Sequence, residues 1–190
     1  MGIRFGIRNR LLFLTGVMLL FMGAVVAFFV YQARDTKEDM ITTVGRIMND
    51  DARDKIMVAT RNMATSLGAA LQGVNGGDER VAVIRKLIGD IRYEADKSGY
   101  FFVYEGTVCR VLPPKPEAEG SDMGGNKDVG GILYVQELQK QAQAGGGFVE
   151  YVFAKPGKGD QPKLSYATMI PGTELWIGTG VYIDNIAEAQ

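Results

Sequence analysis

The hydrophobic pattern of the chain begins with a run of 20 residues, Leu11 to Val30, that contains no charged side chain. In an α-helix this run spans roughly 30 Å, which is the thickness of a bilayer core. We therefore predict one transmembrane helix over residues 11–31. The alternative is a cleavable signal peptide, but its apolar region covers only about 7–15 residues and precedes a small-x-small cleavage site. The length of the run favours a retained anchor.

Positive charge on one side of this run predicts its orientation in the membrane. Residues 1–10 contain three arginines, and residues 1–31 contain no Asp or Glu. Because Lys and Arg are enriched on the cytoplasmic side of membrane helices, residues 1–10 are expected to form a cytoplasmic tail. The chain from residue 32 onwards is then expected in the periplasm or outside the cell.

Helical periodicity continues after the membrane run. Apolar residues recur every three or four positions from Met40 to Val74, which predicts an amphipathic helix of about 35–40 residues, continuous with the membrane helix. A helix this long often packs on a partner helix, so a homodimer is expected. The Asn-Gly-Gly-Asp run at 75–78 ends this helix, and a second helix is predicted from about residue 78 to residue 96.

The pattern then changes to the short, β-branched and aromatic runs that are typical of strands. The predicted order is two strands, one short helix and three further strands, at residues 100–104, 107–112, 132–144, 148–154, 163–170 and 175–183. Runs of adjacent strands favour an antiparallel sheet with helices packed on it. The predicted fold class is therefore α+β.

Composition excludes several classes of chemistry. The chain has 21 basic and 22 acidic residues, for a net charge of −1, so a nucleic-acid partner is not expected. It has no histidine and a single cysteine, Cys109, which excludes His-dependent catalysis, an intrachain disulfide and a Cys-cluster zinc site. Asp122 and Asp128 lie in a Gly-rich loop without a paired acid at a readable spacing. We predict no enzymatic activity, no cofactor and no metal.

Four stretches together give the sequence a family resemblance. They are GYFFVY at 99–104, PEAEG at 116–120, GGFVEY at 146–151 with PKLSY at 162–166, and WIGTGVYIDN at 176–185. In this order they resemble the single Cache domain, type 2, of bacterial methyl-accepting chemotaxis receptors.

The resemblance implies a PAS-like antiparallel sheet of about five strands behind a long N-terminal helix. It also implies that residues 32–186 form an extracytoplasmic sensor domain that binds small molecules, commonly short carboxylates. In such receptors a second transmembrane helix follows, so residues 187–190 are expected to start the exit towards it, and the chain is expected to be a fragment of a longer receptor. One departure matters: family members often carry a histidine before the proline after the second strand, where this chain has Leu112, so a ligand role for that histidine does not transfer.

Binding a small carboxylate requires cationic or hydroxyl donors in a mostly apolar hollow. The candidate ligand-binding residues that offer a charge, a hydroxyl or an aromatic wall are Tyr100, Phe102, Arg110, Tyr151, Lys163 and Tyr166. Each has a structural alternative, because aromatic residues on half-buried strands usually belong to the core and a lysine at a strand edge is usually solvated. Lys163 and Tyr166 also have opposite parity on a regular strand, so they do not share one hollow unless the strand bends.

The functional hypothesis is a membrane-anchored receptor domain whose occupancy by a small organic ligand, a carboxylate, changes signalling across the membrane for chemotaxis. Two alternatives stay open. The domain is a non-sensing binding or dimerisation module, or it is the sensor of a kinase or cyclase instead of a chemoreceptor. The sequence specifies neither the ligand nor the output domain.

Overall fold

The computed structural model describes the backbone of residues 7–155 and 157–183, and the side chains of residues 13–28, 50–155 and 157–183. Most of the predicted cytoplasmic tail and the whole predicted exit segment lie outside these residues. The chain divides into two compact units, Met1–Ile47 and Met48–Gln190, which are described separately. Helix α1 contributes to both, because it runs from Ile7 to Ala70.

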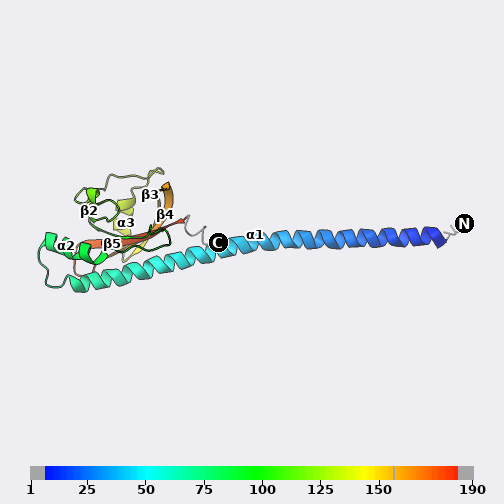
Figure 1. The fold of residues 1–190 in the computed structure, drawn as a ribbon, viewed down its shortest axis with the longest axis horizontal. Helices are drawn as coiled ribbons and strands as arrows, with labels where there is room; N and C mark the ends of the chain where they lie inside the picture. Colours follow the sequence, from blue (N-terminus) through cyan, green and yellow to red (C-terminus); the bar gives the residue numbers. More distant parts are fainter. Residues whose placement is uncertain (1–6, 156, 184–190) are drawn as a thin grey trace. The chain divides into compact units, whose positions relative to one another are not determined.

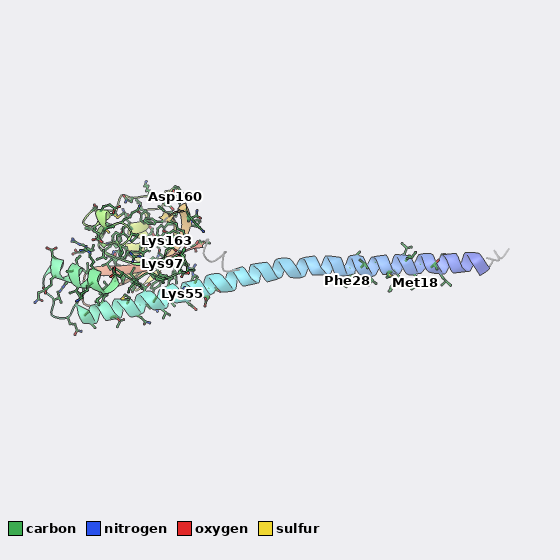
Figure 2. All side chains as sticks on the ribbon, in the orientation of Figure 1. Met18, Phe28, Lys55, Lys97, Asp160 and Lys163 are labelled. Carbon is green, nitrogen blue, oxygen red and sulfur yellow. The ribbon has the colours of Figure 1, made fainter. Side chains whose placement is uncertain are left out.

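The described side chains of the first unit form an exposed apolar surface. Residues 13–28 are exposed throughout, and the side chains of Met18 and Phe28 project from α1 in Figure 2. Among the residues that the structure describes, no helix combines the length and the apolar character needed to cross a bilayer. The predicted span also includes residues 11–12 and 29–31, whose side chains lie outside the described set, and it stays a prediction.

The second unit is an α+β domain, as the sequence pattern predicts. Its helices are the end of α1, α2 (Gly77–Ile88), the 3-10 turn η1 (Pro116–Ala118) and α3 (Tyr134–Gln143). Its strands are β1 (Phe101–Glu105), β2 (Val108–Val111), β3 (Gly147–Lys155), β4 (Gly159–Met169) and β5 (Leu175–Tyr182).

The five strands form one sheet in the order β2-β1-β5-β4-β3, and every neighbouring pair is antiparallel. The last strand of the sequence therefore lies in the middle of the sheet, between β1 and β4. All eight residues of β5 are buried, as expected for a central strand covered on both faces. This order places β1, which carries Phe102, and β4, which carries Lys163 and Tyr166, on either side of β5.

The second helix is shorter than the sequence predicts. Helix α2 ends at Ile88 and not near residue 96, because the chain leaves the helical path there and Ile91 and Tyr93 pack against the core from outside the helix. The chain then turns, and Glu94 and Lys97 adopt positive φ values of 66° and 58°. This turn lets the backbone of residue 93 pair with Gly99 and deliver the chain to β1.

Strand alternation sorts the sheet's side chains onto two faces. On the face that we call the helix face, Phe101, Val103 and Ile177 pack against Leu67 of α1 and Ile84 of α2. Figure 1 shows the end of α1 and the helix α2 along this side of β5. Most side chains of this cluster are aliphatic, with the phenyl ring of Phe101 among them, so they form a conventional apolar core.

The opposite face, which we call the aromatic face, is covered by α3 and by the segment that leads to it. Its buried cluster is rich in rings that carry a polar group, namely Tyr100, Tyr104, Tyr134, Tyr151 and Trp176, with Phe102 among them. Buried tyrosine and tryptophan rings need partners for their O–H and N–H groups. The polar groups of these rings therefore need hydrogen-bond partners inside this part of the core.

Candidate ligand-binding pocket

Lys163 is buried on the aromatic side of β4, with only 1% of its surface exposed. Its ammonium nitrogen Nζ donates a hydrogen bond of 2.8 Å to the hydroxyl of Tyr100. The same nitrogen lies 4.1 Å from the ring centre of Tyr100, 4.9 Å from that of Tyr182 and 5.3 Å from that of Phe153. Aromatic faces attract a cation, so these rings offset part of the cost of burying the amine.

The charge of Lys163 has no acidic counterpart. Among the described side chains, no Asp or Glu forms an ion pair with it. Burial therefore lowers the pKa of Lys163 from its ordinary value of 10.5 to about 7. The other buried lysine, Lys155, differs in this respect, because its Nζ lies 2.8 Å from a carboxylate oxygen of Asp96.

A small cavity lies between the aromatic face and α3. It is lined by residues of β1, β3 and α3, by the residue before β1 and by the residue after β2: Tyr100, Phe102, Tyr104, Leu112, Tyr134, Val135, Leu138, Tyr151 and Phe153. None of these lining side chains is charged. The cavity measures about 10 Å³, which is room for roughly one water molecule. Formate, the smallest carboxylate, is larger than that, so the pocket is closed in this structure.

Four tyrosines, Tyr100, Tyr104, Tyr134 and Tyr151, line this closed pocket. Tyr134 stacks on Tyr151, with ring centres 4.9 Å apart and planes 7° from parallel, and the Tyr151 hydroxyl is joined to that of Ser165 by a hydrogen bond of 3.1 Å. Burial raises the pKa of Tyr100 and of Tyr151 well above the ordinary tyrosine value. Both hydroxyls therefore stay protonated and available as hydrogen-bond donors.

The outer wall of the pocket is fastened to the sheet through Asp128. One carboxylate oxygen of Asp128 accepts hydrogen bonds from the backbone N–H groups of Gly130 and Ile132, and the other accepts from Val152 on β3 at 2.9 Å. These donors, Val152 first, lower the pKa of the Asp128 carboxyl. The loop that leads into α3 is thereby fixed to the edge of the sheet, directly before the wall residue Tyr134.

The structure brings four of the six predicted site residues together. Tyr100, Phe102 and Tyr151 line the cavity, and Lys163 contacts the first of these. Figure 2 places Lys163 inside the domain. Their role in binding stays a prediction.

The other two predicted residues lie elsewhere. Arg110 pairs with Glu105 across the β1–β2 turn at 2.6 Å, away from the cavity lining. Tyr166 belongs to a cluster with Ile56 of α1 on the opposite side of the sheet, where its hydroxyl accepts a hydrogen bond of 2.9 Å from Nε of Arg61. The physical reason is strand parity: β4 stays regular over these residues, so Lys163 and Tyr166 point to opposite faces.

Several wall residues were not among the predicted site residues. Tyr104 and Phe153 share strand parity with Tyr100 and Tyr151, so alternation alone identifies them once the correct face is known. Tyr134 comes from a helix that packs on the sheet, and no local signal in the sequence indicates this.

Gly178 also shapes the pocket wall. A Cβ atom at this position would lie 2.5 Å from Cε2 of Phe102, so the missing side chain is what allows that ring to lie against β5. Among the described residues, no group of three or more Cys, Asp or Glu side chains is arranged to hold a metal ion.

Comparison with protein families and with curated proteins gives a consistent result. The family model described as Single Cache domain 2 matches residues 45–190. The sensor histidine kinase MctS of Rhizobium johnstonii is 28% identical over 167 residues, which cover 86% of this chain and 36% of the kinase. The methyl-accepting chemotaxis protein CtpM of Pseudomonas aeruginosa is 26% identical over 166 residues, which cover 84% of this chain and 27% of that protein. The chain thus spans well under half the length of either relative.

Solved structures with a similar fold are sensor domains of chemotaxis proteins. A methyl-accepting chemotaxis protein from Vibrio parahaemolyticus superposes with a TM-score of 0.65 at 25% identity, covering 75% of this chain and 95% of that one. A periplasmic sensor domain of a chemotaxis protein gives 0.60 at 29% identity, covering 71% and 94%. A Cache chemosensory domain that recognises carboxylic acids gives 0.63 at 24% identity, covering 73% and 98%, and shows the shared fold.

Proposed function

Since the chain belongs to the Single Cache domain 2 family, as its sequence resemblance predicted, we propose that it is the extracytoplasmic sensor domain of a membrane receptor and that it binds a short monocarboxylate. The observation that carries the ligand class is Lys163, a buried lysine without an acidic partner among the described residues, beside a cavity walled by aromatic rings. An anion in that cavity supplies a counter-charge for this amine.

The charges around the pocket favour one carboxylate over other small ligands. With one buried cation and an uncharged lining, a second carboxylate would be buried without a partner, which disfavours dicarboxylates. An amino acid would place its ammonium group among the same uncharged walls, close to Lys163. The carboxylate oxygens accept hydrogen bonds from Nζ of Lys163 and from the hydroxyls of Tyr100 and Tyr151, and the aliphatic end contacts Phe102 and Phe153.

Ligand entry requires the wall to move, because the closed cavity holds only about one water molecule. The sheet side of the wall is held by paired strands, whereas α3 is joined to it by packing and by the loop that Asp128 fastens. We propose that α3 and this loop move outward to admit the ligand. Closure afterwards excludes water, which strengthens the Lys163–carboxylate attraction.

A signal from the pocket has a direct contact path to α1. The backbone oxygen of Tyr100 accepts a hydrogen bond of 2.6 Å from the Thr179 hydroxyl, which is itself hydrogen-bonded to the hydroxyl of Tyr93. The next residue, Glu94, pairs with Lys55 of α1 at 2.6 Å. We propose that ligand shifts a two-state equilibrium along this path. A tenfold shift requires a difference of about 1.4 kcal/mol in binding free energy between the two states.

The same proposal includes the orientation of the chain in the membrane and its association with a second copy. Residues 11–31 span the inner membrane with the N-terminus in the cytoplasm, the domain lies in the periplasm, and α1 packs on a second copy of the chain. The receptor signals by binding and performs no catalysis. Chemotaxis is the first candidate output, and the similarity to MctS over 86% of this chain supports a kinase output as the second.

The test is calorimetric titration of the full 190-residue chain in detergent with acetate, propionate, succinate and alanine. We expect propionate or acetate to bind, and Lys163→Met to weaken that binding by roughly 30-fold or more, because the ligand charge then loses its partner. The exposed Lys86→Met variant is the matched control and should bind like the native chain. Monocarboxylate affinity that is the same in all three proteins would contradict the proposal.

A further inference from the structure

The surroundings of Lys163 suit a nucleophile as well as a counter-ion. Its amine is desolvated, lacks an acidic partner among the described residues, and is hydrogen-bonded at 2.8 Å to one protonated hydroxyl, that of Tyr100. Resting on the proposed function, we propose that Lys163 captures 2-oxo acids by forming a reversible imine with their carbonyl carbon. This sensor would then hold a keto acid covalently and a saturated or hydroxy acid only by charge and hydrogen bonds.

A lysine attacks a carbonyl group only when its amine is neutral, and a desolvated position favours that form. The pKa of Lys163, lowered by burial to about 7, leaves a large neutral fraction at pH 7–8. Lys155 provides the contrast inside the same domain. It is also buried, but Asp96 lies 2.8 Å from its Nζ and favours the charged form.

The chemical step balances without an oxidant or a reductant. Neutral Nζ of Lys163 adds to the carbonyl carbon to give a carbinolamine, and the carbon–oxygen bond then breaks as a carbon–nitrogen double bond forms. The two protons of the amine pass to the leaving oxygen, which departs as water. The Tyr100 hydroxyl relays protons between nitrogen and oxygen, because it is bonded to Nζ and burial keeps it protonated.

The product suits the pocket in charge and in hydration. Once protonated from solvent, the imine keeps one positive charge where the ammonium group was, beside the carboxylate of the captured acid. Hydrolysis of the imine needs a water molecule, and a captured acid, which is larger than the space for about one water molecule, fills that space. Closure of the wall therefore favours the imine, and opening it favours release.

The 2-oxo acid class follows from combining two requirements. The carboxylate is the group that the proposed site recognises, and the carbonyl carbon of a 2-oxo acid is bonded directly to it. One short ligand can thus place its carboxylate by the hydroxyls of Tyr100 and Tyr151 and its carbonyl by Nζ of Lys163. A simple aldehyde lacks the recognised anion, and lactate has the anion but no carbonyl group.

The experiment compares pyruvate with lactate on the full chain. Each ligand is first titrated by calorimetry, and the protein is then treated with cyanoborohydride, which reduces an imine to a stable secondary amine. Peptide mass spectrometry locates the adduct. We expect one reduced adduct per chain at Lys163 with pyruvate and none with lactate. Lys155 and Lys86 should stay unmodified, and Lys163→Arg, which keeps the charge, should give no adduct at that position.

The outcomes separate this inference from the proposed function. If both acids bind and pyruvate labels Lys163 selectively, the inference stands. If both bind but labelling is absent, or is spread equally over the exposed lysines, the imine is ruled out and carboxylate binding survives. If neither acid binds, the imine is ruled out, and the titration with acetate and propionate decides whether the proposed function is overturned as well.

Discussion

The two faces of the sheet share the same strands but differ in chemistry. The main cluster on the helix face consists mostly of aliphatic side chains from the sheet, α1 and α2, although Tyr166 and Thr179 are also buried on that side. The aromatic face carries tyrosine hydroxyls, the indole of Trp176, a cavity and the buried Lys163. Apolar packing on the first face stabilises the position of α1 on the sheet. The second face keeps polar groups that an apolar core would not need, and the proposed binding site is placed there for that reason.

The sharpest test of the difference between the two faces is to truncate one buried leucine in the helix that covers each face, Leu67 of α1 and Leu138 of α3. Leu67→Ala on the helix face should lower the free energy of unfolding by about 2–5 kcal/mol, because the side chain is fully buried. Propionate affinity of the folded protein should stay unchanged. Leu138→Ala shortens a side chain that lines the cavity and so enlarges the cavity. It should instead raise the affinity for butyrate relative to propionate. Denaturant unfolding measures the stability of the two variants, and calorimetry measures their affinities for propionate and butyrate. If both variants changed these affinities equally, the distinction between the faces would be contradicted.

Gly178→Ala should push the aromatic face inward. The new Cβ would meet the ring of Phe102 at 2.5 Å, so the ring must move into the cavity, at a cost of about 1–3 kcal/mol in unfolding free energy. Propionate affinity should fall by tenfold or more. Adding Phe102→Leu should restore much of it by making room. A Gly178→Ala variant with native affinity would show that this ring does not limit the pocket.

Carboxylate affinity should depend on pH through Lys163. The pKa of this lysine is about 7 without ligand, and a bound anion raises it by favouring the charged form. Affinity should therefore be constant below pH 7 and fall by about tenfold per pH unit above it, until the pKa of the bound state is reached. Lys163→Arg should flatten the profile. A native profile that is flat from pH 6 to pH 9 would contradict the assignment.

Asp128→Asn should loosen the outer wall without changing its composition. The amide of Asn has only one acceptor oxygen. That oxygen accepts hydrogen bonds either from the loop or from Val152 on β3, but not from both. We expect the association rate of propionate to rise a few-fold in stopped-flow measurements, because the wall opens more often. A control substitution at the adjacent residue of the same loop, Lys127→Gln, should leave the association rate of propionate unchanged.

The smallest effect is expected for an ion pair at the surface. Glu150 of β3 and Arg53 of α1 lie 3.3 Å apart, with 59% and 34% of their side chains exposed. Glu150→Gln should change the free energy of unfolding by less than about 1 kcal/mol, because exposed pairs are well screened by solvent. A larger loss would mean that this contact is as important for holding α1 as the helix face.

Periodicity in the sequence was sufficient for the fold class and the five strands, because these rest on local patterns. The family came from the resemblance carried by four motifs in order. The residues of the candidate site could be predicted only in part. Alternation groups Tyr100 with Phe102 and separates Lys163 from Tyr166, but it does not say which face holds the ligand. The burial of Lys163 depends on packing between β1, β3 and β5, and Tyr134 reaches the pocket from α3. Such contacts between distant segments leave no local signal.

The predicted end of α2 was wrong for a similar reason. Apolar residues continue beyond Ile88 with helical spacing, but Ile91 and Tyr93 pack from a turn and not from a helix. The hydroxyl of Tyr93 bonds to the backbone oxygen of Gly180 on β5 at 3.2 Å. A tertiary contact therefore overrides the helical pattern in this segment.

Proton uptake on ligand binding is the most direct measurement of the central claim, which is that the amine of Lys163 meets a carboxylate in this pocket. Propionate is titrated into the full chain at pH 8 in two buffers of different ionisation enthalpy. At that pH most of the amine is neutral without ligand, so binding should take up close to one proton per chain, and Lys163→Met should take up none. Equal heats in the two buffers for the native protein would contradict the account.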